Sequence, residues 1–187
     1  MGRFYENAAF DVRTREMFPF ELKGDCLAEA FGDWKSHPGF LAHGSTLHGF
    51  HNRLRAAVDL FADEAGKEVL AFDEEALPHW QLLNYGQQIV DVAHSHHHAE
   101  DHVYFPRYLA AFPQLERPLS LLDGDHKVLD ESLDALEASV KALKPGATLH
   151  GWERSRDAAE QLQQIIHRHL DDEEEIVMPV LINRYEG

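Results

Sequence analysis

The segment HSHHHAEDHVYFP, residues 94–106, holds four imidazoles within its first five residues, and two acids follow them. A second segment, HLDDEEEIVMP at residues 169–179, repeats part of this pattern. In both segments three residues separate a histidine from a glutamate, and five more separate the glutamate from a proline. Residues i and i+4 lie on one face of an α-helix, about 5–6 Å apart at Cβ. An imidazole and a carboxylate at this spacing can therefore reach the same cation.

Around these segments, apolar residues recur at intervals of three and four, and strand-like alternation is absent. Gly66 is expected to end the first helix, Pro106 to kink or end the second, and Pro179 to interrupt the fourth. The pattern predicts an all-α fold: an antiparallel up-down-up-down four-helix bundle with an N-terminal extension. The expected helices cover about residues 44–64, 78–105, 119–143 and 149–177.

The chain of 187 residues fits one domain of ordinary size, preceded by a short extension. We interpret residues 1–43 as an N-terminal arm and residues 44–184 as the bundle. Four phenylalanines favour an arm that packs on the bundle rather than one that floats free; they are Phe4, Phe10, Phe18 and Phe20.

Each predicted helix carries a histidine within its apolar stripe. In the fourth helix, for example, His169 and Glu173 fall between Ile165 and Ile176 at steps of three and four. Two buried carboxylates without partners would cost several kcal/mol each, so a cation is expected beside them. Counting residues from the connecting loops places the histidines at a similar height. The candidate metal ligands are His51, His96, Glu100, His126, His169 and Glu173.

The donor types narrow the choice of metal. Four imidazoles and two carboxylates exceed the four ligands of a structural zinc, and Cys26 is the single cysteine. Mixed nitrogen and oxygen ligation by more than four groups suits iron or manganese. The set fits best two ions bridged by Glu100 and Glu173.

With these motifs in view, the chain resembles the hemerythrin-like (HHE cation-binding) domain family over about residues 44–182. HHHAEDHVYFP is similar to the second-helix signature of that family, and HLDDEEEIVMP to the fourth. The resemblance implies a non-haem di-iron centre: two Fe ions with an oxo or hydroxo bridge, held by the same six residues. It also implies O2, NO or peroxide as small ligands, or a role in sensing or handling iron.

Two positions depart from the oxygen carriers of this family. The carriers have a second histidine four residues after the one in helix three, where this chain has Asp130. They also have an aspartate five residues after the helix-four histidine, whereas here Glu173 lies at plus four and Glu174 follows. The pattern is closer to the six-ligand branch, which includes iron-sensing and cluster-repair proteins.

Several neighbouring residues have alternative roles. His43 and His48 are alternatives or additions to His51 as ligands from the first helix. The side chain of His97 lies on the border between the inward and the outward face of its helix. Asp130 is either a seventh ligand or a solvent-facing residue. Tyr104, one turn beyond Glu100, either caps the site or serves packing. The expected solvated positions are His94, His98 and His102, together with residues 171–175 apart from Glu173.

Charge and hydropathy limit the class of partner. The net charge of −16 disfavours nucleic acids and anionic lipid surfaces. No run of about 18 apolar residues is present, and the N-terminus lacks the features of a signal peptide. We therefore expect a cytoplasmic protein, with Cys26 a small packed side chain rather than a catalytic thiol.

Three functions are compatible with these features. The first is a di-iron protein that senses or handles O2, NO or iron. The second is a mononuclear protein for zinc or another divalent metal, without redox chemistry, and manganese is an alternative occupant. The third is a structural interaction module whose protein partner is unknown. The sequence assigns no catalytic residue and no organic cofactor, so enzyme activity stays open. A ferritin-like ferroxidase is disfavoured, because that class requires Glu-x-x-His on two helices, and here Asp123–His126 merely approaches this motif.

Overall fold

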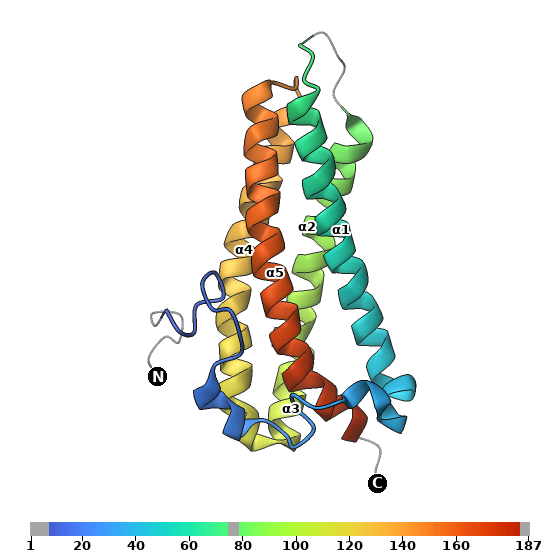
Figure 1. The fold of residues 1–187 in the computed structure, drawn as a ribbon, viewed down its shortest axis with the longest axis vertical. Helices are drawn as coiled ribbons and strands as arrows, with labels where there is room; N and C mark the ends of the chain where they lie inside the picture. The colour runs from blue at the N-terminus through green and yellow to red at the C-terminus, as the bar shows by residue number, and fades with distance from the viewer. Residues whose placement is uncertain (1–7, 75–78, 184–187) are drawn as a thin grey trace.

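The computed structural model describes residues 8–74 and 79–183. This part of the chain contains helices and no strand, so the predicted all-helical class is confirmed. Figure 1 shows long helices that lie side by side along one axis as a helical bundle. The four longest are α1 (Ser45–Leu70), α2 (Trp80–Ala99), α4 (Glu116–Leu143) and α5 (Leu149–Asn183).

Pro106 does not end the second helical rod. A π-helical turn, η5 (Glu100–Tyr104), follows α2, and the rod then continues as α3 (Phe105–Ala111). Within η5 the N–H of Phe105 bonds to the carbonyl of Glu100, five residues back. A proline ring would clash with the carbonyl four residues before it in a regular α-helix. The wider turn just before Pro106 accommodates this clash, so the helix bulges instead of stopping.

Two predicted helix ends were wrong. Helix α1 continues through Gly66 to Leu70, and no described glycine has the positive φ of a helix-ending residue. Helix α5 continues through Pro179 to Asn183, with Val177 and Val180 buried on either side of the proline. The predicted start of the second helix near Pro78 lies outside the described residues.

The bundle core consists of two large apolar clusters with polar residues between them. One cluster contains Leu129 of α4 and Leu170 of α5; the other contains Leu122 and Ile176 of the same two helices. In each helix about two turns separate the residues of the two clusters. His126 lies in this interval in α4, and Glu173 lies in it in α5. The apolar layers on either side fix the height of these polar side chains.

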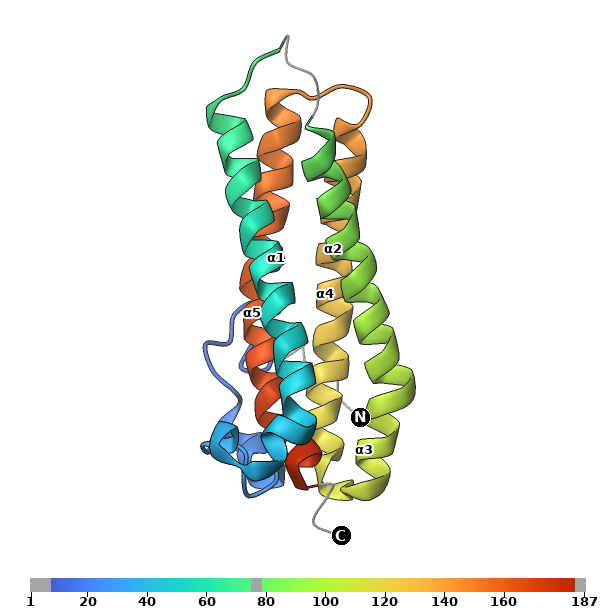
Figure 2. The same ribbon diagram turned by 90° about the vertical axis from the view of Figure 1, so that its right-hand side faces the viewer.

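The N-terminal residues pack against α4 and α5. Figure 2 shows the blue segment beside the lower part of α5. Phe18 and Leu22 are buried in the same cluster as Val180. Trp34 is buried against Met178 and Ile182, whereas Phe20 is exposed and Phe4 lies outside the described residues. Three short turns, η2 (Phe20–Asp25), η3 (Trp34–Ser36) and the π-helical η4 (Phe40–Gly44), lead into α1. The division of the chain near residue 43 stays a prediction.

Within the described residues, no helix combines the length and the apolar character needed to cross a bilayer.

Candidate metal centre

The six predicted ligand positions come together in the interior of the bundle. The rings of His51 and His96 lie 5.2 Å apart between centroids, and those of His126 and His169 lie 4.9 Å apart. These four rings come from α1, α2, α4 and α5, one from each helix. His51 and His169 are fully buried. The four histidines therefore lie at a common height in the bundle, as the sequence predicted.

The two glutamates lie between the imidazoles. Oε1 of Glu100 is 3.0 Å from Nε2 of His96, and its Oε2 is 3.5 Å from Nε2 of His126. Oε2 of Glu173 is 3.4 Å from Nε2 of His51 and 3.8 Å from Nε2 of His169. Each carboxylate thus approaches one imidazole from the α1–α2 pair and one from the α4–α5 pair. A carboxylate in such a position can bridge two ions.

A seventh residue, His97, belongs to the cluster, although its direction was ambiguous in the sequence. Its side chain is buried, and its ring stacks on His126 with 4.5 Å between centroids and an interplanar angle of 14°. The only local signal for His97 is its place beside His96, since an apolar stripe about 100° wide can include two adjacent positions. The expected six-residue cluster therefore becomes a seven-residue cluster.

The seven side chains form two groups of potential ligand atoms, each spanning at most 4.8 Å. One group is His97, His126 and His169, and the other is His51, His96, Glu100 and Glu173. The first group is all nitrogen, while the second mixes nitrogen and oxygen. The glutamates of the second group also reach toward the first, so the two groups form one continuous centre.

The donor atoms of this centre fit a metal. Buried polar atoms normally have hydrogen-bond partners. Here the atoms without a hydrogen-bond partner include both carboxylate oxygens of Glu100, Oε2 of Glu173, both ring nitrogens of His97, and Nε2 of His51, His96, His126 and His169. Two donors bound at right angles, each about 2.1 Å from one ion, lie about 3 Å apart. The shortest separations across the centre agree with that value.

The opposite nitrogens of three imidazoles face carboxylates. Nδ1 of His126 lies 2.7 Å from Asp101, Nδ1 of His169 lies 3.3 Å from Asp125, and Nδ1 of His51 lies 3.1 Å from Glu174. A carboxylate accepts hydrogen bonds, so it selects the tautomer that carries its proton on Nδ1. The lone pair on each Nε2 then points into the centre, as metal binding requires.

These outer carboxylates were not found from the sequence, and residues 171–175 were wrongly expected to be mostly solvated. Asp172 and Glu174 are buried. Asp172 accepts a hydrogen bond from Nε of Arg15 at 2.8 Å, and Glu174 accepts one from Nη1 of Arg55 at 2.8 Å. Buried carboxylates are tolerated where such cations compensate them. The pairing partners lie on other segments of the chain, so no local pattern reveals them.

The pKa values of three imidazoles in the centre favour their neutral form. Burial lowers the pKa of His96 to about 3, and it also lowers the pKa of His97 and, by a wide margin, that of His169. Burial and the neighbouring carboxylate of Glu173 raise the pKa of Glu100. Burial acts in the same direction on Glu173, but His51 and His96 outweigh it and leave its pKa below the ordinary value. Neutral imidazole is the form that binds metal ions.

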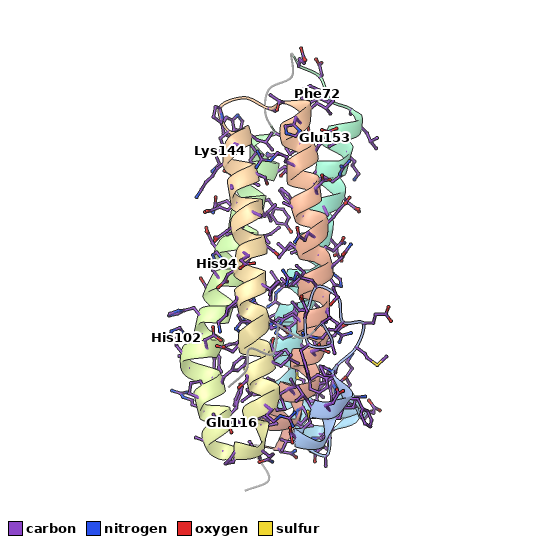
Figure 3. All side chains as sticks on the ribbon, turned by 90° about the vertical axis from the view of Figure 1, so that its left-hand side faces the viewer. Phe72, His94, His102, Glu116, Lys144 and Glu153 are labelled. Carbon is purple, nitrogen blue, oxygen red and sulfur yellow. The ribbon has the colours of Figure 1, made fainter. Side chains whose placement is uncertain are left out.

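The remaining candidates lie outside the two ligand groups. Nδ1 of His48 is 3.2 Å from Glu174, so this residue contacts an outer carboxylate. Asp130, which is half exposed, lies 3.7 Å from Nδ1 of His97, beyond hydrogen-bond distance. His43 and Tyr104 line a cavity described below. His98 and His102 are exposed as expected, and Figure 3 shows His102 on the outer side of its rod.

A helical bundle with buried histidines and glutamates at its centre defines a class, the metal-binding helical bundles. The family model described as the hemerythrin HHE cation binding domain matches residues 43–181. The chain therefore belongs to the hemerythrin HHE cation-binding family, as its motifs predicted. No curated protein and no solved structure matches the chain.

Proposed function

We propose that this protein binds two iron ions in the seven-residue centre and uses them to sense or handle O2, NO or iron. The main support for this proposal is that Glu100 and Glu173 each approach imidazoles of both ligand groups. This arrangement supports two bridged ions rather than one. We also infer that the bundle is the antiparallel up-down-up-down four-helix type, which would bring one imidazole or more from each long helix to the centre.

The chain would divide its ligands between the two ions. His97, His126 and His169 would hold one ion, His51 and His96 would hold the other, and the two glutamates would bridge them. Iron bound in this way supplies reversible electron transfer and affinity for O2, NO or peroxide. The outer carboxylates Asp101, Asp125 and Glu174 would keep the ring orientations fixed while ligands bind and leave.

Iron is favoured over zinc by the number and kind of donors. Seven nitrogen- and oxygen-bearing side chains exceed a tetrahedral shell, and no thiolate lies among them. A mononuclear zinc or manganese protein is the alternative occupant of the same residues. We place the protein in the cytoplasm, with small gaseous or peroxide ligands as its partners and neither nucleic acid nor membrane.

Elemental analysis of the purified protein, after expression in iron-replete medium, tests the proposal. We expect about two irons per chain and an absorption band of the iron centre in air that changes under NO. The variant Glu100→Gln/Glu173→Gln should lose this band and most of the iron. The matched control Glu153→Gln/Glu160→Gln changes two side chains that are 43% and 55% exposed and should keep both. One zinc per chain and no iron would refute the di-iron assignment.

The same double variant separates metal binding from a purely structural role. In the metal-free protein, two buried carboxylates are costly, so their replacement by amides should leave the melting temperature unchanged or raise it. Iron should raise the melting temperature of the parent protein but not of the variant, because a ligand stabilises only the state that binds it. Equal melting temperatures of the parent protein with and without iron would favour an interaction module.

A further inference from the structure

A cavity of about 310 Å³ opens on one side of the metal centre. Its walls are mostly apolar and include Leu47 and Phe50 of α1 and Val177 and Leu181 of α5. The ring of Phe50 also packs on His96, with 4.5 Å between centroids. A cavity of this volume is within the range of small-molecule binding sites.

The floor of the cavity belongs to only one of the two ligand groups. His96, Glu100 and Glu173 line it, whereas His97, His126 and His169 do not. Nε2 of His96 and both oxygens of Glu100 have no hydrogen-bond partner in the protein. A molecule in the cavity would therefore touch His96 and the two glutamates, but none of the three imidazoles of the other group.

Each of the two π-helical turns in the described residues contributes one residue to the rim of the cavity. His43 lies in η4 and Tyr104 lies in η5, and both residues line the cavity. A π turn displaces the backbone outward, and such turns occur frequently at functional sites. Tyr104 is 44% exposed, whereas Val177, another lining residue, is buried. The cavity thus connects solvent to the centre through a partly aromatic rim.

The cavity is too large for a diatomic ligand alone. A water-sized molecule occupies about 30 Å³, and an apolar cavity of about 150 Å³ holds benzene. O2 or NO would leave most of this space empty, and the apolar walls offer few partners for water. The chain carries a net charge of −16 and two carboxylates lie at the floor, so entry of an anion is disfavoured.

From this geometry we propose that the cavity binds a neutral, mainly apolar organic molecule with a single oxygen-bearing head group. The apolar part lies between Phe50, Val177 and Leu181, and the head group faces the floor beside Glu100. The head-group placement rests on the proposed metal function, while the apolar binding does not. The protein would thereby accept an organic ligand larger than O2, NO or hydrogen peroxide.

Titration calorimetry and saturation-transfer NMR with 4-propylphenol test this proposal, with glycerol as a polar probe. Metal-free protein and zinc-loaded protein are both used, because zinc cannot oxidise the phenol. We expect saturable one-to-one binding of 4-propylphenol to the metal-free chain, at least about tenfold tighter than any binding of glycerol. Zinc loading should tighten binding by about threefold or more, since the head group then contacts the ion.

Variants with a larger side chain in the cavity provide a second test. Leu181→Trp places an indole in the cavity and should weaken binding by about tenfold or more. Leu60→Trp is the matched control, because Leu60 is 49% exposed on α1 and lies outside the cavity. Thr46→Trp, at an exposed lining residue, serves if Leu181→Trp fails to fold. Circular dichroism establishes folding for each variant.

The possible outcomes separate this inference from the metal function. No saturable binding, or equal weakening by Leu60→Trp, overturns the cavity as a binding site. Unchanged affinity on zinc loading overturns the head-group placement. Two irons per chain without probe binding would leave the metal function intact and refute this inference. Probe binding to a chain that binds no iron would support the apolar site and refute the proposed di-iron function.

Discussion

The carboxylate of Asp125 accepts a hydrogen bond from Nδ1 of His169 at 3.3 Å, although the two residues are 44 positions apart. The same carboxylate also accepts a hydrogen bond from Nη1 of Arg15 at 2.8 Å. Arg15 comes from the N-terminal segment and is itself buried. A chain of contacts therefore joins this segment to a candidate metal ligand.

Asp125→Asn should weaken metal binding without removing any ligand. An amide is a poorer acceptor than a carboxylate and no longer fixes the tautomer of His169, so we expect about 10–100-fold lower metal affinity. Competition with a coloured chelator measures this. Asp123→Asn, at a more exposed residue that pairs with Lys127, is the control. Unchanged affinity in a folded Asp125→Asn variant would contradict the positioning role.

Arg15→Met should destabilise the protein strongly. The substitution leaves the buried carboxylate of Asp125 without its cation, and loss of one partner of a buried pair costs about 3–5 kcal/mol. Urea denaturation of the metal-free protein at pH 7 measures the free energy of unfolding. Arg13→Met removes a guanidinium that is 47% exposed and should change this free energy by less than about 0.5 kcal/mol. Equal effects of the two substitutions would refute the prediction.

His97→Ala tests the seventh ligand. Without His97, the nitrogen group retains only His126 and His169, so the ion it holds should be lost first. We expect the iron content to fall from about two per chain toward one, by elemental analysis after dialysis. His98→Ala removes the neighbouring exposed imidazole and should retain two irons. Full iron content in both variants would assign His97 to packing alone.

Two helical glycines should respond to alanine in opposite ways. A Cβ on Gly86 would lie 2.6 Å from Phe61 and 3.0 Å from Val140, so Gly86→Ala should cost about 1–3 kcal/mol by overpacking. A Cβ on Gly66 would meet no neighbour within 4 Å, so Gly66→Ala should stabilise α1 by about 0.5–1 kcal/mol. Thermal unfolding of both variants checks the signs, and the same sign for both would contradict the packing argument.

The thiol of Cys26 should react slowly with disulfide reagents. Burial raises its pKa to about 12, so at pH 8 only about one thiol in ten thousand is ionised. Because this pKa lies above the pH range of the assay, the rate should rise about tenfold per pH unit between pH 7 and 9. Stopped-flow measurements with free cysteine as the control test this. A rate that levels off near pH 9 would show that the pKa is not raised.

The helices and most of the centre were predictable because both depend on local spacing. His169 and Glu173 share a face through the i to i+4 geometry of any α-helix, and the apolar residues around them fix which face turns inward. Gly66 misled the prediction of one helix end, and the sequence left open whether Pro106 kinks or ends its helix. A π turn absorbs the proline ring, and a glycine can continue a helix at a modest cost in entropy.

The sequence by itself determined which side chains face the core, since burial of an apolar stripe requires only the periodicity of one helix. It thereby determined the family and six members of the centre. Only the tertiary structure decided that His97 joins them and that Asp101, Asp125 and Glu174 hold the outer nitrogens. Only the tertiary structure also opened a cavity on one side. These features depend on the rotation and height of one helix against another, which packing of the whole chain sets.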